Sequence, residues 1–85
     1  MKPMPHYFYL ARCADSSLYS GTCIDLKARE GKHNEGKGAK YTRSRRPVKI
    51  IYHEKFKTLA GARRREALVK QWSKAAKEDL ILGKG

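Results

Sequence analysis

The sequence predicts an α+β fold in which a small three-stranded antiparallel sheet is flanked by helices, in the order β-β-α-β-α-α. An aromatic-rich run and a second short run, separated by five turn-forming residues, predict a hairpin, and a later alternating run predicts a third strand. Strands joined by a hairpin argue against a purely parallel sheet. A chain of 85 residues has room for one hydrophobic core, so we expect a single domain over residues 1–85 with its core at about 7–82.

The hairpin is predicted from residues 7–12 (YFYLAR) and 18–22 (LYSGT). Aromatic residues favour strands. The five residues between these runs (CADSS) form turns readily, and antiparallel pairing is the simplest connection for strands this close in sequence.

The middle of the chain predicts a helix, a loop and a strand. Asp25 is suited to cap a helix over residues 26–33, with Asn34 at its C-terminal end. Glycines, a proline and clustered charge predict a basic loop over residues 34–47. Alternation of apolar and polar residues predicts the third strand over residues 48–53.

Two further helices are predicted after the third strand. Thr58 can cap a helix over residues 59–72. Ser73 can cap a shorter helix over residues 74–82, and Gly83 ends it.

The composition is strongly basic. The chain contains 20 Lys and Arg residues against 8 Asp and Glu, which gives a formal net charge of +12. Such a field attracts polyanions, of which nucleic acid is the commonest. A surface that only maintains solubility is the alternative, and charge alone does not separate an enzyme that acts on nucleic acid from a passive binder.

The sequence argues against several other classes of protein. Two cysteines, Cys13 and Cys23, are too few for a disulfide framework or a zinc site. Residues 1–6 have no apolar segment like that of a signal peptide, and no stretch has the length of a transmembrane helix. We therefore expect a soluble, cytoplasmic protein with reduced thiols and no membrane partner.

The first of the two C-terminal helices carries an acid on an apolar stripe. At roughly 100° per residue, Glu66 projects on the same side as three apolar residues, Leu59, Ala62 and Val69. A buried carboxylate needs a partner or an edge position. Helix geometry alone slightly favours an ion pair with Lys70, four residues later. The alternative is a metal site, because one carboxylate with waters and phosphate oxygens suits magnesium.

Arg29 and His33 are four positions apart, so both project from one face of the helix over residues 26–33. The guanidinium fork matches phosphate, and a histidine can hold or pass a proton near neutral pH. For each residue alone, a solvated helix face is the better explanation. Together, beside the basic loop, they indicate a phosphate-contacting pair.

Tyr9 and Tyr19 lie on the two strands of the hairpin, and Gly21 lies on the same face as Tyr19. A glycine within a strand often marks the close approach of a ligand or another backbone. Cross-strand packing is the more common explanation for two such tyrosines.

These residues occur in an order that resembles the GIY-YIG nucleases. The successive motifs are YFY at 7–9, YSGT at 19–22, DLKAR at 25–29, HN at 33–34 and RE at 65–66. The likeness extends over about residues 7–82. GAKYT at 38–42 and RPV at 46–48 resemble the compact single-domain branch of bacteria and some viruses.

The resemblance implies a three-stranded sheet and a metal-dependent DNA endonuclease, with a role in DNA repair or processing. One divalent ion, magnesium or manganese, would be held at Glu66. Tyr9 or Tyr19 would help to deprotonate the attacking water, Arg29 would stabilise the charged phosphate, and His33 would assist from the same helix face. Tyr7, Phe8 and Ser20 depart from the family's motifs at positions that shape the strands more than the chemistry.

Two alternatives to a nuclease remain: a DNA- or RNA-binding module with little turnover, and a basic protein that binds ribosomal or other RNA. We expect weak sequence preference and a bias toward single-stranded, branched or damaged DNA. The exposed cations of the loop and of the later helix should bind phosphates, and one tyrosine should stack on an unpaired base. These residues are Lys37, Lys40, Tyr41, Arg43, Arg45, Arg46, Arg63, Arg64 and Lys70.

Overall fold

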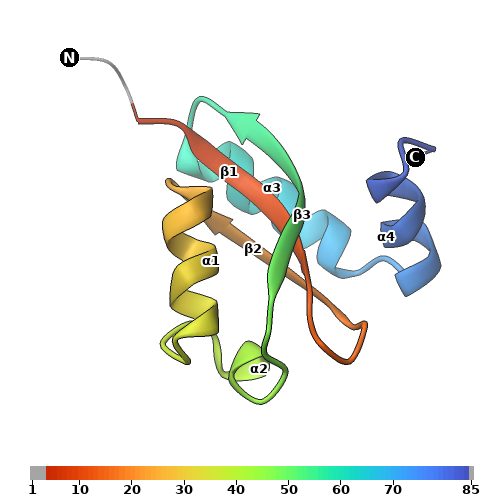
Figure 1. The fold of residues 1–85 in the computed structure, drawn as a ribbon. Helices are drawn as coiled ribbons and strands as arrows, with labels where there is room; N and C mark the ends of the chain where they lie inside the picture. Colours follow the sequence, from red (N-terminus) through yellow and green to blue (C-terminus); the bar gives the residue numbers. More distant parts are fainter. Residues whose placement is uncertain (1–3, 85) are drawn as a thin grey trace.

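The computed structural model describes residues 4–84 and confirms the predicted α+β architecture (Figure 1). Residues 1–3, part of the segment in which a signal peptide was sought, lie outside the described residues. The sheet has the antiparallel order β2-β1-β3. Its elements are β1 (His6–Arg12), β2 (Leu18–Cys23), α1 (Leu26–Asn34), α2 (Lys40–Arg43), β3 (Lys49–Phe56), α3 (Leu59–Lys70) and α4 (Lys74–Ile81).

The three predicted N-caps are confirmed. In each, the side-chain oxygen accepts a hydrogen bond from the backbone N–H three residues later, at 3.0 or 3.1 Å. These bonds satisfy donors that the first turn of a helix otherwise leaves free. The capping residues are Asp25 for α1, Thr58 for α3 and Ser73 for α4.

The prediction of an uninterrupted basic loop over residues 34–47 was wrong, because this segment contains the one-turn helix α2. The Thr42 hydroxyl and backbone N–H both donate to the carbonyl of Ala39, at 2.9 and 3.1 Å. β3 also extends beyond the predicted end to Phe56, which pairs with His6 of β1. Pairing with a neighbouring strand, which a single-strand pattern does not contain, sets that boundary.

The central strand β1 is buried on both faces, and each face supports a small core. α1 lies over one face and α3 over the other (Figure 1), and Leu80 of α4 packs into the core on the α3 side. Alternation along β1 directs successive side chains to the two sides. The α1 side contains Tyr9, Ala11, Cys13, Cys23 and Val48, and the α3 side contains Phe8, Leu10, Val69 and Leu80.

Polar contacts hold the helices to the sheet. Arg12, at the end of β1, makes two hydrogen bonds to the carboxylate of Glu78 on α4, at 2.8 and 2.6 Å. Arg65 on α3 makes two to Glu54 of β3, at 3.0 and 3.1 Å. Both are paired guanidinium–carboxylate contacts, which have defined geometry. Within the described residues, no helix is long and apolar enough to cross a bilayer.

Candidate active site

The sheet brings Tyr9 and Tyr19 together on the face covered by α1. Tyr9 lies opposite Gly21, and Tyr19 lies opposite Ala11, so the two rings are diagonal neighbours with centroids 6.2 Å apart. A Cβ atom on Gly21 would lie 2.6 Å from the Tyr9 hydroxyl oxygen. The group that lies against this glycine is therefore the side chain of Tyr9, not the ligand or backbone that a glycine within a strand often marks.

α1 places Arg29 and His33 on its face toward the tyrosines. The Tyr9 hydroxyl lies 2.8 Å from Nε2 of His33, and the centroid of the Tyr19 ring is 5.4 Å from that of the imidazole. His33 is only 1% exposed, so it lies behind the two tyrosines instead of on the surface. Arg29 is half-buried one helical turn earlier.

His33 has a second partner that sequence reasoning missed. Nδ1 of its ring lies 2.9 Å from the Thr42 hydroxyl oxygen, which in turn donates to the carbonyl of Ala39 at 2.9 Å. Gly38 packs directly against the imidazole. The loop segment contains no periodicity that connects Thr42 with a histidine nine residues earlier, so only the folded chain reveals this contact.

The electrostatics of the site link both tyrosines to charged groups. Burial raises the pKa of Tyr9 well above its usual range, with a contribution from Tyr19, and Arg29 opposes this. Burial also raises the pKa of Tyr19, Glu66 adds to the rise, and Arg29 opposes it. Burial lowers the pKa of His33, and Arg29 lowers it further. His33 is therefore neutral at pH 7, because its ordinary value of about 6.5 is already below neutrality.

Glu66 is half-buried on α3, and its negative charge raises the pKa of Tyr19. None of the ion pairs within residues 4–84 joins it to Lys70, so the structure does not contain the pair that helix geometry slightly favoured. The described residues also form no cluster of three His, Cys, Asp or Glu side chains. A single carboxylate fits a divalent ion that keeps most of its coordination for water and phosphate oxygens, as magnesium does.

Two shallow cavities share the half-exposed ring of Tyr19. The Arg29 cavity, of about 330 Å³, is lined by Tyr19, Arg29, Lys32, Lys37, Gly38 and Ala39. The Lys70 cavity, of about 270 Å³, is lined by Leu18, Tyr19, Ser20, Tyr41, Lys70 and Lys77. Sequence reasoning did not select Lys32 or Lys77, because neither lies in the basic loop or is itself a motif residue.

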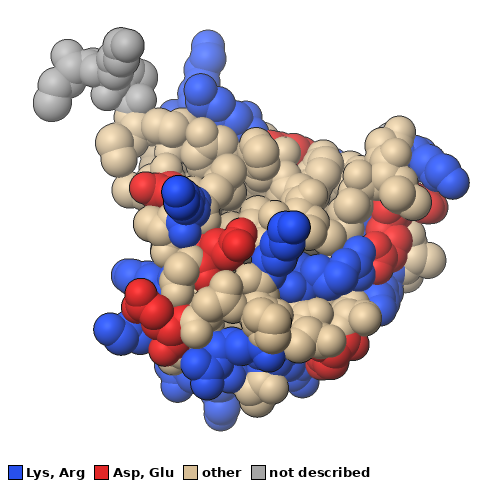
Figure 2. Space-filling view, viewed as in Figure 1, with Lys and Arg blue, Asp and Glu red and all other residues tan. Residues whose placement is uncertain are grey.

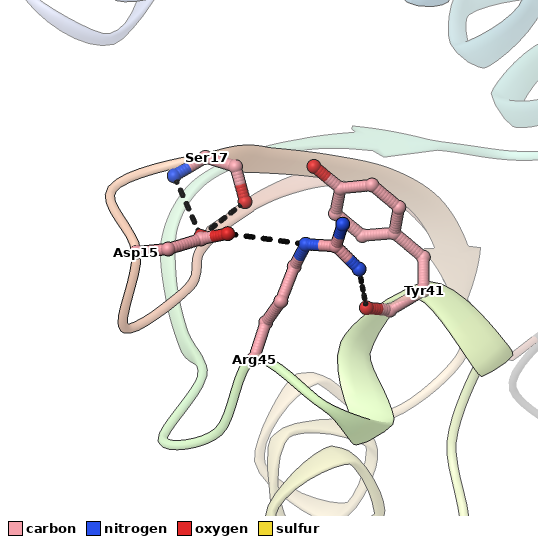
Figure 3. A network of polar contacts seen from close by, with 4 residues as sticks. All are labelled: Asp15, Ser17, Tyr41 and Arg45. Atoms are coloured by element: carbon pink, nitrogen blue, oxygen red, sulfur yellow. Dashed lines mark hydrogen bonds and ion pairs between the residues drawn. The ribbon is translucent and has the colours of Figure 1, made fainter.

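The cations expected to bind nucleic acid do not all have free side chains. Arg45 donates to Asp15 at 3.1 Å and to the carbonyl of Tyr41 at 2.8 Å, and its guanidinium lies 3.9 Å from the centroid of the Tyr41 ring (Figure 3). Tyr41, 39% exposed, also stacks on Tyr19. Arg46 donates to two backbone carbonyls, those of Arg43 and Asn34, the second at 3.4 Å.

The remaining cations of that set are exposed. Lys37 and Lys70 line the two cavities, whereas the others line neither. Figure 2 shows Lys and Arg side chains spread over one face, gathered most closely in its lower part, with acidic side chains between them. The other exposed cations are Lys40, Arg43, Arg63 and Arg64.

Comparison with known proteins identifies relatives over nearly the whole chain. The model of the GIY-YIG catalytic domain matches residues 5–79. A UPF0213 protein of Bacillus pumilus is 50% identical over 78 residues, which cover 92% of this chain and 80% of that protein. A UPF0213 protein of Streptococcus agalactiae is 49% identical over 77 residues, covering 91% and 88%.

Two solution NMR structures have a similar fold. A UPF0213 protein from Bacillus halodurans matches with a TM-score of 0.61 and 43% identity, covering 96% of this chain and 87% of that one. A protein from E. faecalis matches with a TM-score of 0.63 and 42% identity, covering 93% and 84%. The three-stranded sheet with its flanking helices is therefore shared with experimentally determined structures.

Proposed function

Because the chain belongs to the GIY-YIG family, as its motifs predicted, we propose that it is an endonuclease that hydrolyses phosphodiester bonds of DNA with one divalent ion. Hydrolysis requires groups that offset charge on phosphate and accept a proton from water, whereas a passive binder needs only cations. The observation that supports the proposal is the convergence of five side chains from four elements: Tyr9, Tyr19, Arg29, His33 and Glu66.

Arg29 is the group that we assign to the scissile phosphate. It lines a cavity together with Lys32 and Lys37, so an anion there meets three positive charges. In-line attack builds negative charge on the phosphate oxygens, and the planar guanidinium can donate two parallel hydrogen bonds to them.

Glu66 would hold the divalent ion, magnesium or manganese. Its carboxylate has no hydrogen bond or ion pair among the contacts of residues 4–84, so it is free to act as a ligand. When bound, such an ion offsets charge on the attacking and leaving oxygens.

Tyr9, with His33, is the proton acceptor that the hydrogen bonds favour. A neutral phenol is a base only if its own proton has somewhere to go, and Tyr9 faces Nε2 of a neutral imidazole at 2.8 Å. A proton from the attacking water would join the Tyr9 oxygen as the phenolic proton moves to Nε2, leaving an imidazolium. Tyr19 has no such acceptor in the described part of the chain, and Glu66 opposes its ionisation. Tyr9 is buried in the free protein, so we expect water to reach it only in the complex, where catalytic contacts commonly tighten.

The two cavities on either side of Tyr19 suggest the path of the substrate. One phosphate would lie near Arg29, and a neighbouring phosphate would lie near Lys70 and Lys77. Ser20 adds a buried hydroxyl, 4% exposed, that has no partner in the described structure. Contacts to phosphates and stacking on tyrosine carry little sequence information. We therefore propose weak sequence preference, a bias toward single-stranded, branched or damaged DNA, and a role in DNA repair or processing.

Cleavage of labelled single-stranded, duplex and branched DNA, with magnesium or with a chelator, tests the proposal. Glu66→Gln keeps the shape of the side chain and removes its charge, and Asp79→Asn is the matched control on an exposed acid of α4. We expect Arg29→Ala to lower the rate on the order of 10²- to 10³-fold, as loss of one charge-stabilising donor does. Equal background cleavage by the wild type and Glu66→Gln would refute the nuclease proposal.

A binding module with little turnover is the second candidate, supported by the net charge of +12. Its expected result is salt-dependent binding of DNA or RNA that does not change with Glu66→Gln or with chelator. Preference for RNA over DNA of the same sequence, without cleavage of either, would indicate the third candidate, an RNA-binding protein.

A further inference from the structure

The segment around α2 contacts His33 at two points that the proposed chemistry leaves unexplained. The Thr42 hydroxyl lies 2.9 Å from Nδ1 of the imidazole, and Thr42 is fully buried. Gly38 lies against the other side of the contact, where a Cβ atom would collide with Nδ1 and lie 3.1 Å from the Cα atom of His33. The G-x-x-x-T spacing thus places two groups next to Nδ1 of His33: the backbone of Gly38, which has no side chain, and the hydroxyl of Thr42.

The direction of every hydrogen bond in this chain of contacts follows from its last member. A backbone carbonyl can only accept, so the Thr42 hydroxyl proton points to the carbonyl of Ala39 at 2.9 Å. The Thr42 oxygen must therefore accept from Nδ1–H of His33. A neutral imidazole with its proton on Nδ1 has a lone pair on Nε2, and that lone pair accepts the phenolic proton of Tyr9.

We propose that Thr42 is a positioning residue that holds neutral His33 in the Nδ1–H tautomer, so that Nε2 stays free to take the proton of Tyr9. The bond from Nδ1 to Thr42 is the same before and after Nε2 is protonated, so the ring keeps its orientation throughout. Without the hydroxyl, the Nε2–H tautomer can form, and it donates to Tyr9 instead of accepting from it. The effect on turnover rests on the proposed nuclease function, but the tautomer itself does not.

Gly38 allows the hydroxyl to come close enough. A side chain at this position would displace the imidazole or push the segment from Gly38 to Thr42 away from α1. Gly38→Ala should therefore break the contact between His33 and Thr42 from the opposite side, without removing the hydroxyl.

NMR of the imidazole nitrogens tests the tautomer directly. In two-bond ¹H–¹⁵N spectra of labelled protein, recorded above the pKa of His33, we expect a protonated Nδ1 and an unprotonated Nε2. Thr42→Val should give the reverse or a mixed pattern, and Thr42→Ser should restore the original one. His6 and His53 make no hydrogen bond to Thr42 in the described structure, so their signals serve as internal controls.

An unchanged His33 pattern in Thr42→Val would overturn the proposal, as would an Nε2–H tautomer in the wild type. Backbone amide spectra of the same samples report folding, and Thr42→Ala provides a second variant if valine disrupts the core. If the wild type cleaves DNA, Thr42→Val should lower the rate roughly 10- to 100-fold, the usual effect of losing an orienting partner, and Thr42→Ser should recover most of it. In a Tyr9→Phe background the Thr42 effect should disappear, whereas a purely structural effect would persist.

If no variant and no wild-type sample cleaves DNA, the nuclease proposal fails while the NMR result still stands for or against the tautomer. The two proposals therefore fail separately.

Discussion

Replacement of Gly21 by alanine tests whether the Tyr9 ring needs the space that the glycine leaves. A Cβ atom at this position would lie 2.6 Å from the hydroxyl oxygen of Tyr9, 2.7 Å from its Cζ atom and 2.9 Å from its Cε2 atom. Tyr9 is fully buried, so the ring cannot swing into solvent. It must shift within a packed core.

The expected change in stability follows from two opposing terms. Overpacking a well-packed core costs about 1–3 kcal/mol. Alanine also restricts the unfolded chain, which returns about 0.4–1 kcal/mol. We expect a net loss of roughly 1–2 kcal/mol in the free energy of unfolding. At about 4–8 °C per kcal/mol for a domain of this size, this corresponds to a fall in Tm of roughly 5–15 °C.

Gly31→Ala is the matched control. Gly31 lies in α1 and has nothing within 4 Å of an added Cβ atom. The free energy of unfolding of this variant should rise by roughly 0.5–1 kcal/mol, because alanine is the better helix former. Thermal and urea unfolding of both variants measure the two signs. If Gly21→Ala unfolds at or above the wild-type temperature, the argument about the Tyr9 ring is wrong.

Three other predictions concern charge. A hydrogen bond from Arg12 lowers the pKa of Glu78, so the ion pair stabilises the fold above the ordinary carboxyl pKa, and this stability is lost as the pH falls through the lowered pKa. In urea unfolding, Glu78→Gln should therefore lose less free energy of unfolding on acidification than the wild type does. Burial and a hydrogen bond to the Glu54 carboxylate raise the pKa of Tyr52 from 10.0 to about 12. The neutral phenol therefore stabilises the fold fully below pH 10, and this stability is lost as the pH rises toward 12. Tyr52→Phe should lose less free energy of unfolding at alkaline pH than the wild type does. Lys70→Ala and Lys77→Ala should each reduce the salt slope of DNA binding by about one contact.

Each of these has a result that contradicts it. An acid unfolding curve of Glu78→Gln parallel to that of the wild type would mean that the ion pair contributes no pH-dependent stability. An alkaline curve of Tyr52→Phe parallel to the wild type would mean that the half-buried phenol contributes no pH-dependent stability. Lys57→Ala, an exposed lysine outside both cavities, is the control for the salt slope, and an equal change in all three lysine variants would remove the argument for a specific path.

Much of the fold could be predicted because its signals are local. Aromatic residues around a short turn, three capping side chains and an alternating third strand are readable within windows of a few residues. α2 and the end of β3 could not be read in this way. The first depends on contact with α1, and the second on pairing with β1.

The same distinction between local signals and tertiary contacts applies to the candidate site. Arg29 and His33 share a face because helix periodicity places them there, and the location of Tyr9 and Tyr19 on one face follows from the hairpin. The environment of each group did not follow. The ion pair of Glu66 with Lys70, reasonable from helix geometry, is not present in residues 4–84, whereas the charge of Glu66 raises the pKa of Tyr19 on a different element.

The sequence by itself determined the α+β class, the excess of positive charge and the set of residues that resembles a nuclease site, since composition, period and motif order are properties of the chain alone. Only the tertiary structure showed that His33 lies buried between Tyr9 and Thr42 and that Tyr19 separates two cationic cavities. Such relations join residues far apart in the chain. Hydrogen-bond direction and burial, which govern how a proton moves, exist only after those residues meet.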